Sequence, residues 1–281
     1  MPYYDWRSLL LCVLKSYGTA LNKCYITNVR TRDLKRPHYK AVFISDTHLG
    51  TKSCKAQRLH RFLDSFTSDY LFLVGDMIDG WALRRRHYWP KTHTEVLRRI
   101  LKLSERCKVI YLPGNHDDFV RPFLKEDMSL ANVTITDSYV YEGVYVTHGD
   151  YFDWTMRIPR QAINLFAHLW DWMPHNEGHK SFTDTMYKWM GTETNIVRWI
   201  QRKGYVACLT GHTHSPKIKE HYMNCGDWTS NCSYIVHTID NTWELKYYGK
   251  RNQEDSGEVV QDVSETSESV GETSDTEDGK A

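Results

Sequence analysis

The chain has 281 residues, and its 36 Lys and Arg residues nearly balance its 35 Asp and Glu residues, for a formal net charge of +1. Apolar residues make up 41% and charged residues 25%, close to the average for a globular protein. These values exclude a collagen-like chain, a fully disordered chain and a membrane protein with several spans. Residues 251–281 carry ten acidic residues against two basic ones, so residues 1–250 have a net charge of +9. That basic part suits a phosphate-bearing partner or an anionic membrane surface.

The cysteines and the N-terminal residues indicate the cellular compartment of the protein. The seven cysteines are an odd number without a Cys-x-x-Cys pair, so the sequence predicts neither a disulfide framework nor a zinc knuckle. The apolar run at residues 8–14 is too short to span a membrane, and no small-residue cleavage site follows it. We therefore expect a cytoplasmic protein, and the sequence leaves open whether it also contacts a membrane surface.

In chain order, residues 1–37 form a basic extension with a helical stripe of apolar residues, either a packed helix or a membrane-surface anchor. Residues 38–150 alternate β-rich runs with helical patterns, which predicts an α/β sheet. The expected strands are 41–45, 71–74, 109–112, 133–136, 139–147, 205–209, 233–239 and 242–248, and the expected helices are about 55–67 and 92–106. Residues 251–281 contain no aromatic residue and are rich in Glu, Ser, Thr and Gly, which predicts a disordered acidic tail.

Five short motifs rich in Asp, His and Asn each follow one of these β-rich runs. They are Asp46-Thr47-His48, Gly75-Asp76-Met77-Ile78-Asp79, Gly114-Asn115-His116-Asp117, His148-Gly149-Asp150 and Gly211-His212-Thr213-His214. Each motif alone is typical of a surface turn. All five in this order, at the strand ends where α/β folds bind ligands, indicate one common site.

The donor set of these motifs points to divalent metal ions. Oxygen and imidazole nitrogen donors without cysteine suit Mn²⁺, Fe, Mg²⁺ or Zn²⁺. Two such cations ~3.5–4 Å apart need a bridging carboxylate, and they convert water to a hydroxide that attacks phosphorus. A separate protonatable group near the leaving oxygen then assists its departure.

With all five motifs, the chain resembles the calcineurin-like metallophosphoesterases over roughly residues 40–245. The resemblance implies a four-layer α/β/β/α sandwich spanning residues 38–250, with two divalent metal ions, Mn²⁺ first among them. It assigns the first metal to Asp46, His48 and His214, the second to Asn115, His148 and His212, and the bridge between them to Asp76. It also implies that His116 stabilises or protonates the leaving oxygen, with Asp79 or Asp117 orienting its imidazole.

Within that family the chain is most similar to the UDP-2,3-diacylglucosamine diphosphatase-like group. This similarity lies in the segment Gly80-Trp81-Ala82-Leu83-Arg84-Arg85-Arg86-His87-Tyr88-Trp89-Pro90, in His148-Gly149-Asp150-Tyr151-Phe152-Asp153, and in the insert that follows. His116 stands where the lipid A pathway enzymes of this group tend to have Arg, a departure that affects the substrate rather than the hydrolysis. The guanidinium groups of Arg84, Arg85 and Arg86 suit substrate phosphate, although a solvated basic turn is the alternative.

Residues 151–203 hold five of the ten tryptophans and two helical apolar stripes, which predicts a helical cap inserted between the fourth and fifth motifs. Most of these residues would pack within the cap and on the sandwich. Trp170 belongs to the first stripe and Trp172 lies beside it, and both are the expected contacts for an acyl chain or the membrane interface.

The sequence therefore predicts a metal-dependent phosphoester or pyrophosphate hydrolase that acts on a phosphorylated small molecule or a lipid-linked substrate. A nuclease or a phosphoprotein phosphatase of the same fold is the alternative enzyme. Nucleic acid is disfavoured, because the basic residues form no nucleic-acid-binding module. A non-catalytic scaffold is disfavoured because no metal ligand is missing from the motifs.

Overall fold

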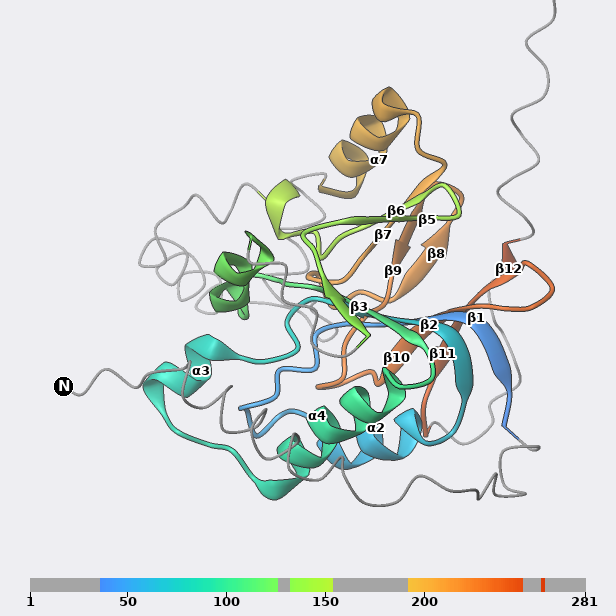
Figure 1. Cartoon of the computed structure of the whole chain (residues 1–281). Helices are drawn as coiled ribbons and strands as arrows, with labels where there is room; N and C mark the ends of the chain where they lie inside the picture. The colour runs from blue at the N-terminus through green and yellow to red at the C-terminus, as the bar shows by residue number, and fades with distance from the viewer. Residues whose placement is uncertain (1–35, 126–131, 154–191, 250–258, 261–281) are drawn as a thin grey trace, which may run out of the picture. The chain divides into compact units, whose positions relative to one another are not determined.

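The computed structural model describes residues 36–125, 132–153, 192–249 and 259–260. Within these ranges the strands form a seven-stranded sheet, here called the large sheet, and a five-stranded sheet, the small sheet. Figure 1 shows helices on the outer side of each sheet. The predicted positions of Trp170 and Trp172 lie outside the described residues.

The large sheet is built around β1 (His38–Ile44), which pairs in parallel with β2 (Thr67–Val74). Parallel pairing continues to β3 (Lys108–Leu112) and β4 (Val133–Ile135). On its other side β1 pairs antiparallel with β10 (Ser233–His237), followed by β11 (Trp243–Tyr247) and β12 (Val259–Val260). The parallel half therefore delivers the first three motifs to one edge of the sheet.

The small sheet has the order β5-β6-β7-β9-β8. Its strands are β5 (Tyr139–Tyr141), β6 (Val144–Val146), β7 (Ala207–Thr210), β8 (Lys217–Lys219) and β9 (Tyr222–Asn224). β6 and β7 run parallel, so the fourth and fifth motifs, which follow them, also leave the sheet side by side.

Alternation along β1 shows why the two sheets stack. Val42 and Ile44 pack in one core with residues of α2 (Ala56–Leu63) and α4 (Lys91–Leu103). Ala41 and Phe43 point to the opposite face, as the two-residue period of a strand requires, and pack in a second core with residues of the small sheet.

The small sheet is covered on its outer side by α7 (Thr192–Lys203). Ile196 and Ile200 of α7 pack with Cys208 of β7 and Tyr222 of β9 in a third core. The layers are thus helices, large sheet, small sheet and helix (Figure 1), and the predicted α/β/β/α sandwich is confirmed.

Three sequence predictions differ from the structure. The single strand expected at 139–147 is a hairpin, because Glu142 and Gly143 both have a left-handed backbone (φ 49° and 76°), as a tight turn requires. Residues 192–203, assigned to the cap, form the outer layer α7. Two residues of the expected disordered tail form β12, which pairs with β11 at Trp243 and Glu244.

Among the described residues, none of the helices has the length and apolar character needed to cross a lipid bilayer.

Candidate metal centre

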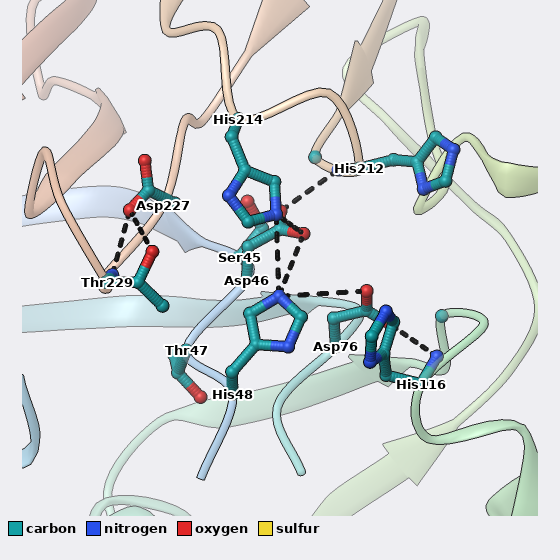
Figure 2. Close-up of polar contacts among 12 residues, drawn as sticks. Ser45, Asp46, Thr47, His48, Asp76, His116, His212, His214, Asp227 and Thr229 are labelled. Atoms are coloured by element: carbon teal, nitrogen blue, oxygen red, sulfur yellow. Dashed lines mark hydrogen bonds and ion pairs between the residues drawn. The ribbon is translucent and has the colours of Figure 1, made fainter. Parts of the chain in front are cut away.

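The side chains of the first and fifth motifs meet where β1 and β7 end. Oδ1 of Asp46 lies 3.1 Å from Nε2 of His214, and Nε2 of His48 lies 3.4 Å from the same nitrogen. Nε2 of His48 is 3.9 Å from Oδ1 of Asp46. Figure 2 shows these three side chains turned toward one another, as the ligands of one metal ion would be.

Asp76 lies between this group and the fourth motif. Its Oδ2 is 4.0 Å from Nε2 of His48 and 3.4 Å from Nε2 of His148. Asp46, Asp76 and His148 can also place one ligand atom each within 4.8 Å of one another. A carboxylate with histidines of two different loops on either side has the placement that a bridging ligand needs.

Buried atoms without a hydrogen bond show that this donor set fits metal ions. Within the described part of the chain, Oδ1 of Asp46, Oδ1 of Asn115 and Nε2 of His148 are buried and receive or donate no hydrogen bond. Unsatisfied buried polar atoms are costly, so several at one place call for a ligand. The site therefore suits divalent metal ions, in keeping with its Asp and His clusters.

The backbone of the motifs is strained. Asp46, His48, Asp76, His212 and His214 all have φ between 48° and 65°, in the left-handed region that side chains other than Gly rarely adopt. Each such residue costs about 1–3 kcal/mol and persists only where the surrounding structure enforces it. Five residues with this conformation at one place indicate that the loop conformation serves to orient the candidate ligands, at a cost in stability.

The charges of the centre shift its pKa values in opposite directions. Burial by itself would raise the pKa of Asp76, but His148, His116 and His48 outweigh it and lower that pKa. Burial would lower the pKa of His214, yet the nearby negative charge of Asp46 raises it to about 9. The pocket thus attracts positive charge strongly, which is what a cation site requires.

His116 is held from two sides at the edge of the centre. Its Nδ1 lies 3.0 Å from Oδ2 of Asp79, and the ring of Trp81 lies over its ring with centroids 4.1 Å apart. Asp79 also begins α3 (Gly80–Arg85), where its side chain accepts a hydrogen bond from the backbone N–H of Ala82. The carboxylate that contacts His116 is therefore fixed by the helix that follows it.

Asp79 has a second partner in His48, whose Nδ1 lies 3.2 Å from the same Oδ2. A carboxylate on Nδ1 holds the proton there and leaves Nε2 available to a metal ion. One side chain thus contacts both a candidate ligand and the candidate acid, and for this reason His48, Asp79 and His116 also cluster.

Asp117, the other residue expected to orient His116, is engaged elsewhere. Its Oδ2 accepts hydrogen bonds from the backbone N–H of Met77 (2.7 Å) and the hydroxyl of Tyr111 (2.5 Å). Its Oδ1 accepts from the backbone N–H groups of Gly114 and Asp76. Of the two alternatives, the geometry favours Asp79 for contact with His116, while Asp117 ties the second motif loop to the third.

Of the remaining predicted ligands, His212 lies close to His148, which is assigned to the second metal ion. The ring centroid of His212 is 5.2 Å from that of His148, and its backbone N–H donates to Oδ2 of Asp46 at 3.0 Å. Figure 2 shows the His212 ring turned away from His214. Asn115 follows β3 and is buried.

The predicted phosphate-binding arginines lie on the surface beside this centre. Arg84 and Arg85 end α3, Arg86 follows them, and all three side chains are exposed. Two further contacts to site histidines escaped sequence reasoning: the ring of Trp81 on His116 and the carboxylate of Asp153 on His212. Both residues stand inside segments that were recognised only by similarity, and neither matches a ligand pattern.

Comparison with known proteins agrees with this geometry. The model of the calcineurin-like phosphoesterase family matches residues 39–216, a range that includes all five motifs. A probable cyclic nucleotide phosphodiesterase of Coxiella burnetii (strain RSA 493 / Nine Mile phase I) is 27% identical over 123 residues. That match covers 41% of this chain and 42% of the relative, so the chain spans less than half of the relative's length.

Two solved structures are also similar. They are the nuclease MPE of Pseudomonas putida (16% identity, 63% of this chain and 62% of that chain, TM-score 0.28) and the phosphoesterase Yfce of E. coli (20% identity, 73% and 90%, TM-score 0.37). Both TM-scores are low, so neither structure bears on the activity. With the family match across all five motifs, the chain belongs to the calcineurin-like phosphoesterase family.

Proposed function

We propose that this protein hydrolyses a phosphoester or pyrophosphate bond at a centre of two divalent metal ions. The observation that carries the proposal is the position of Asp76, 4.0 Å from Nε2 of His48 and 3.4 Å from Nε2 of His148. Asp46, His48 and His214 would hold one ion, and Asn115, His148 and His212 the other. Mn²⁺ is the first candidate, with Fe, Zn²⁺ and Mg²⁺ as alternatives. When bound, the ions activate water at neutral pH and neutralise charge on the phosphate oxygens.

The chain's own acid in this reaction would be His116. The Asp79 carboxylate, 3.0 Å from Nδ1, favours a proton on that nitrogen and leaves Nε2 to face the substrate. Transfer of the Nε2 proton to the departing oxygen lowers the barrier most when the leaving group is a poor one. The ring of Trp81, whose centroid lies 4.1 Å from that of His116 at an interplanar angle of 34°, would keep the imidazole from rotating away.

For the substrate we propose a nucleotide-linked or lipid-linked phosphate of the UDP-2,3-diacylglucosamine type. Support comes from α3, which begins at Gly80 beside Asp79 and ends at Arg85. At 1.5 Å per residue its ends are about 8 Å apart, so its exposed arginines lie within reach of a second phosphate group. A lipid-linked substrate would also bring the protein to the membrane surface, where its basic part is attracted to anionic lipid.

A cyclic nucleotide is the second candidate substrate, because the relative from Coxiella burnetii is named as a probable cyclic nucleotide phosphodiesterase. A phosphodiester ring needs the same two-metal chemistry but offers no acyl chain and no second phosphate. The arginines of α3 would then contribute little to binding.

The test is a substrate panel with purified protein and Mn²⁺: an acylated UDP-sugar, a cyclic nucleotide, an oligonucleotide and a phosphopeptide. We expect hydrolysis of the acylated UDP-sugar with the highest kcat/KM. Arg84→Ala and Arg85→Ala should raise KM for it, while Arg58→Ala, at an exposed arginine of α2, serves as the matched control. Preference for the cyclic nucleotide, with no effect of the α3 variants, would replace the proposed substrate. If the metal-loaded protein hydrolyses none of these substrates, the proposed hydrolase activity is wrong.

A further inference from the structure

A buried carboxylate outside the expected ligand set contacts one of the proposed ligands. Oδ2 of Asp153 lies 2.8 Å from Nε2 of His212, and the two side chains are 0% and 6% exposed. The acceptor is a carboxylate, so the imidazole nitrogen donates this hydrogen bond. Burial excludes water as a competing partner and makes the contact stronger than it would be on the surface.

Asp153 is held in place by the turn that precedes it. Its backbone N–H donates to the carbonyl oxygen of Asp150, closing the short 3₁₀ helix η3 (Asp150–Phe152). Arg121 donates to Oδ2 of Asp150 at 2.9 Å, and the ring of Phe152 packs against Trp199 of α7. The turn that carries the Asp153 carboxylate is therefore held by contacts to Arg121 and to Trp199.

His212 is also fixed at its backbone, where its N–H donates to Oδ2 of Asp46 at 3.0 Å. With the main chain on Asp46 and Nε2 on Asp153, the ring has little freedom to rotate. Its centroid lies 5.2 Å from that of His148, with the planes at 74°. The ring nitrogen that would bind a metal ion is therefore the other one, Nδ1.

This arrangement reverses the one found at two other proposed ligands. His48 has its Nδ1 on Asp79, and His148 has its Nδ1 on the carbonyl oxygen of Val74, so both leave Nε2 toward the centre. At His212 the anchored nitrogen is Nε2. The protonated nitrogen of a ligand histidine is set by its outer hydrogen bond, so the tautomer of His212 should be the opposite one.

We propose that Asp153 is a positioning residue that holds His212 as the Nε2–H tautomer and so presents Nδ1 to the second metal ion. The proposal rests on the two-metal centre of the proposed function. Asp153 is the last residue of the segment His148-Gly149-Asp150-Tyr151-Phe152-Asp153, and the proposed function gives it no other role. Loss of such an outer partner typically weakens metal binding by roughly 10- to 100-fold.

The variants are Asp153→Ala, which removes the acceptor, and Asp153→Asn, which keeps its volume and removes its charge. Asp137→Asn is the matched control, since this exposed carboxylate contacts Arg121 at 3.3 Å in the same region. Each protein is checked for folding by thermal melting. Long-range ¹H–¹⁵N NMR of metal-free protein then gives the tautomer of His212, with its signals assigned from their loss in His212→Gln. Calorimetric titration with Mn²⁺ gives the affinities of the two ions separately.

We expect an Nε2–H tautomer for His212 in the wild type and in Asp137→Asn, and its loss in Asp153→Ala. One of the two Mn²⁺ affinities should fall roughly 10- to 100-fold in Asp153→Ala, while the other stays within about 3-fold. Asp153→Asn, whose amide oxygen still accepts a hydrogen bond from Nε2, should show the smaller change in both measurements. An unchanged tautomer and two unchanged affinities in folded Asp153→Ala would overturn the proposal. So would equal loss of both ions, or a wild type that binds a single ion. Neither readout requires turnover, so a protein that passes them but hydrolyses no phosphoester fails only the proposed activity.

Discussion

His148 donates a hydrogen bond from Nδ1 to the carbonyl oxygen of Val74, the last residue of β2, at 2.9 Å. The bond crosses from the small sheet to the large one, and it turns Nε2 of His148 toward Asp76. Gly75 follows Val74, and a Cβ atom at Gly75 would lie 2.2 Å from that same Nδ1. The close approach of the two loops thus depends on a residue without a side chain.

Gly75→Ala should displace His148 and abolish metal binding. The matched control is Gly204→Ala, because Gly204 has nearly the same φ (76° against 79°) but nothing within 4 Å of an added Cβ. Backbone strain alone costs about 1–2 kcal/mol at both positions, so only the collision distinguishes them. Thermal melting and elemental analysis measure the outcome. Equal behaviour of the two variants would show that the His148 contact does not limit the site.

Asp76→Ala should lose both ions and all turnover, because neither ion keeps the proposed bridging ligand. Asp227→Ala is a useful comparison, since Asp227 is buried but its Oδ1 accepts hydrogen bonds from backbone N–H groups of its own loop, at Thr229 and Ser230. That variant should lower stability more than it lowers metal content per folded chain. Two tightly bound metals in Asp76→Ala, found by elemental analysis, would remove the bridging assignment.

His116→Ala should keep its metal content while kcat falls about 10²-fold or more on a substrate with a poor leaving group. The loss should shrink on a substrate with a good leaving group, since protonation is then less needed. Trp81→Leu should show the same dependence with a smaller loss, because it loosens the imidazole without removing it. A loss of metal in His116→Ala at a normal rate per bound ion would mean that His116 is a ligand.

The attachment of α7 should depend on pH. Glu193 contacts Lys217 at 3.3 Å and Lys219 at 2.5 Å on β8. Burial by itself would raise the pKa of Glu193, but both lysines outweigh it and lower the pKa. A lowered carboxyl pKa stabilises the fold above the unfolded value of 4.5, and this contribution disappears as pH falls through the folded value.

Glu193→Gln should therefore reduce the free energy of unfolding near neutral pH by at most about 1 kcal/mol, since the pair is partly exposed. The difference from wild type should vanish below the lowered pKa of Glu193. Urea unfolding across pH 3–7 measures it, with Glu95→Gln, whose contact to Lys91 is longer at 3.7 Å, as the control. A difference that grows toward acid pH would contradict the ion pairs.

Two truncations of the acidic C-terminal segment should differ in their effect on stability. Deleting residues 261–281 keeps β12, whereas deleting 252–281 removes it and leaves the edge of β11 unpaired at Trp243 and Glu244. The longer deletion should lower the melting temperature by a few degrees more than the shorter one. Neither should change hydrolysis of a small water-soluble phosphoester, because no proposed ligand is removed. A large loss of activity in the shorter deletion would give the tail a role in the site.

The motif loops were predictable because each combines an apolar β-rich run with a following Asp, His or Asn pattern, and both signals are local. Asp46 and His214 lie far apart in the chain, yet each lies in the loop that follows a strand, so their meeting at 3.1 Å follows from the topology. By contrast, β8 and β9 have three residues each, too few for a two-residue period to be read.

The contacts around the ligands were not predictable for a different reason. Trp81 on His116 and Asp153 on His212 depend on how α3 and η3 leave their strands, which no residue pattern specifies. For the same reason Asp79 and Asp117 could not be told apart as partners of His116. The sequence shows two aspartates near the histidine, whereas only the fold shows that the Asp79 carboxylate contacts His116 and that the Asp117 carboxylate accepts from Met77 and Gly114 instead.

The stacking of Phe43 of β1 on Phe72 of β2, with centroids 4.5 Å apart, lies in the core between the two sheets. Asp46 and Asp76 follow strands of the large sheet, whereas His148 and His214 follow strands of the small one. The thickness of this aromatic layer consequently affects how closely the two groups of proposed ligands approach each other. Substituting a smaller residue for Phe43 or Phe72 would leave a cavity that the two sheets close only in part. The resulting shift would change the distance between Asp46 of the large sheet and His214 of the small one, so that a defect in catalysis could originate in the interior of the protein without any change to a motif.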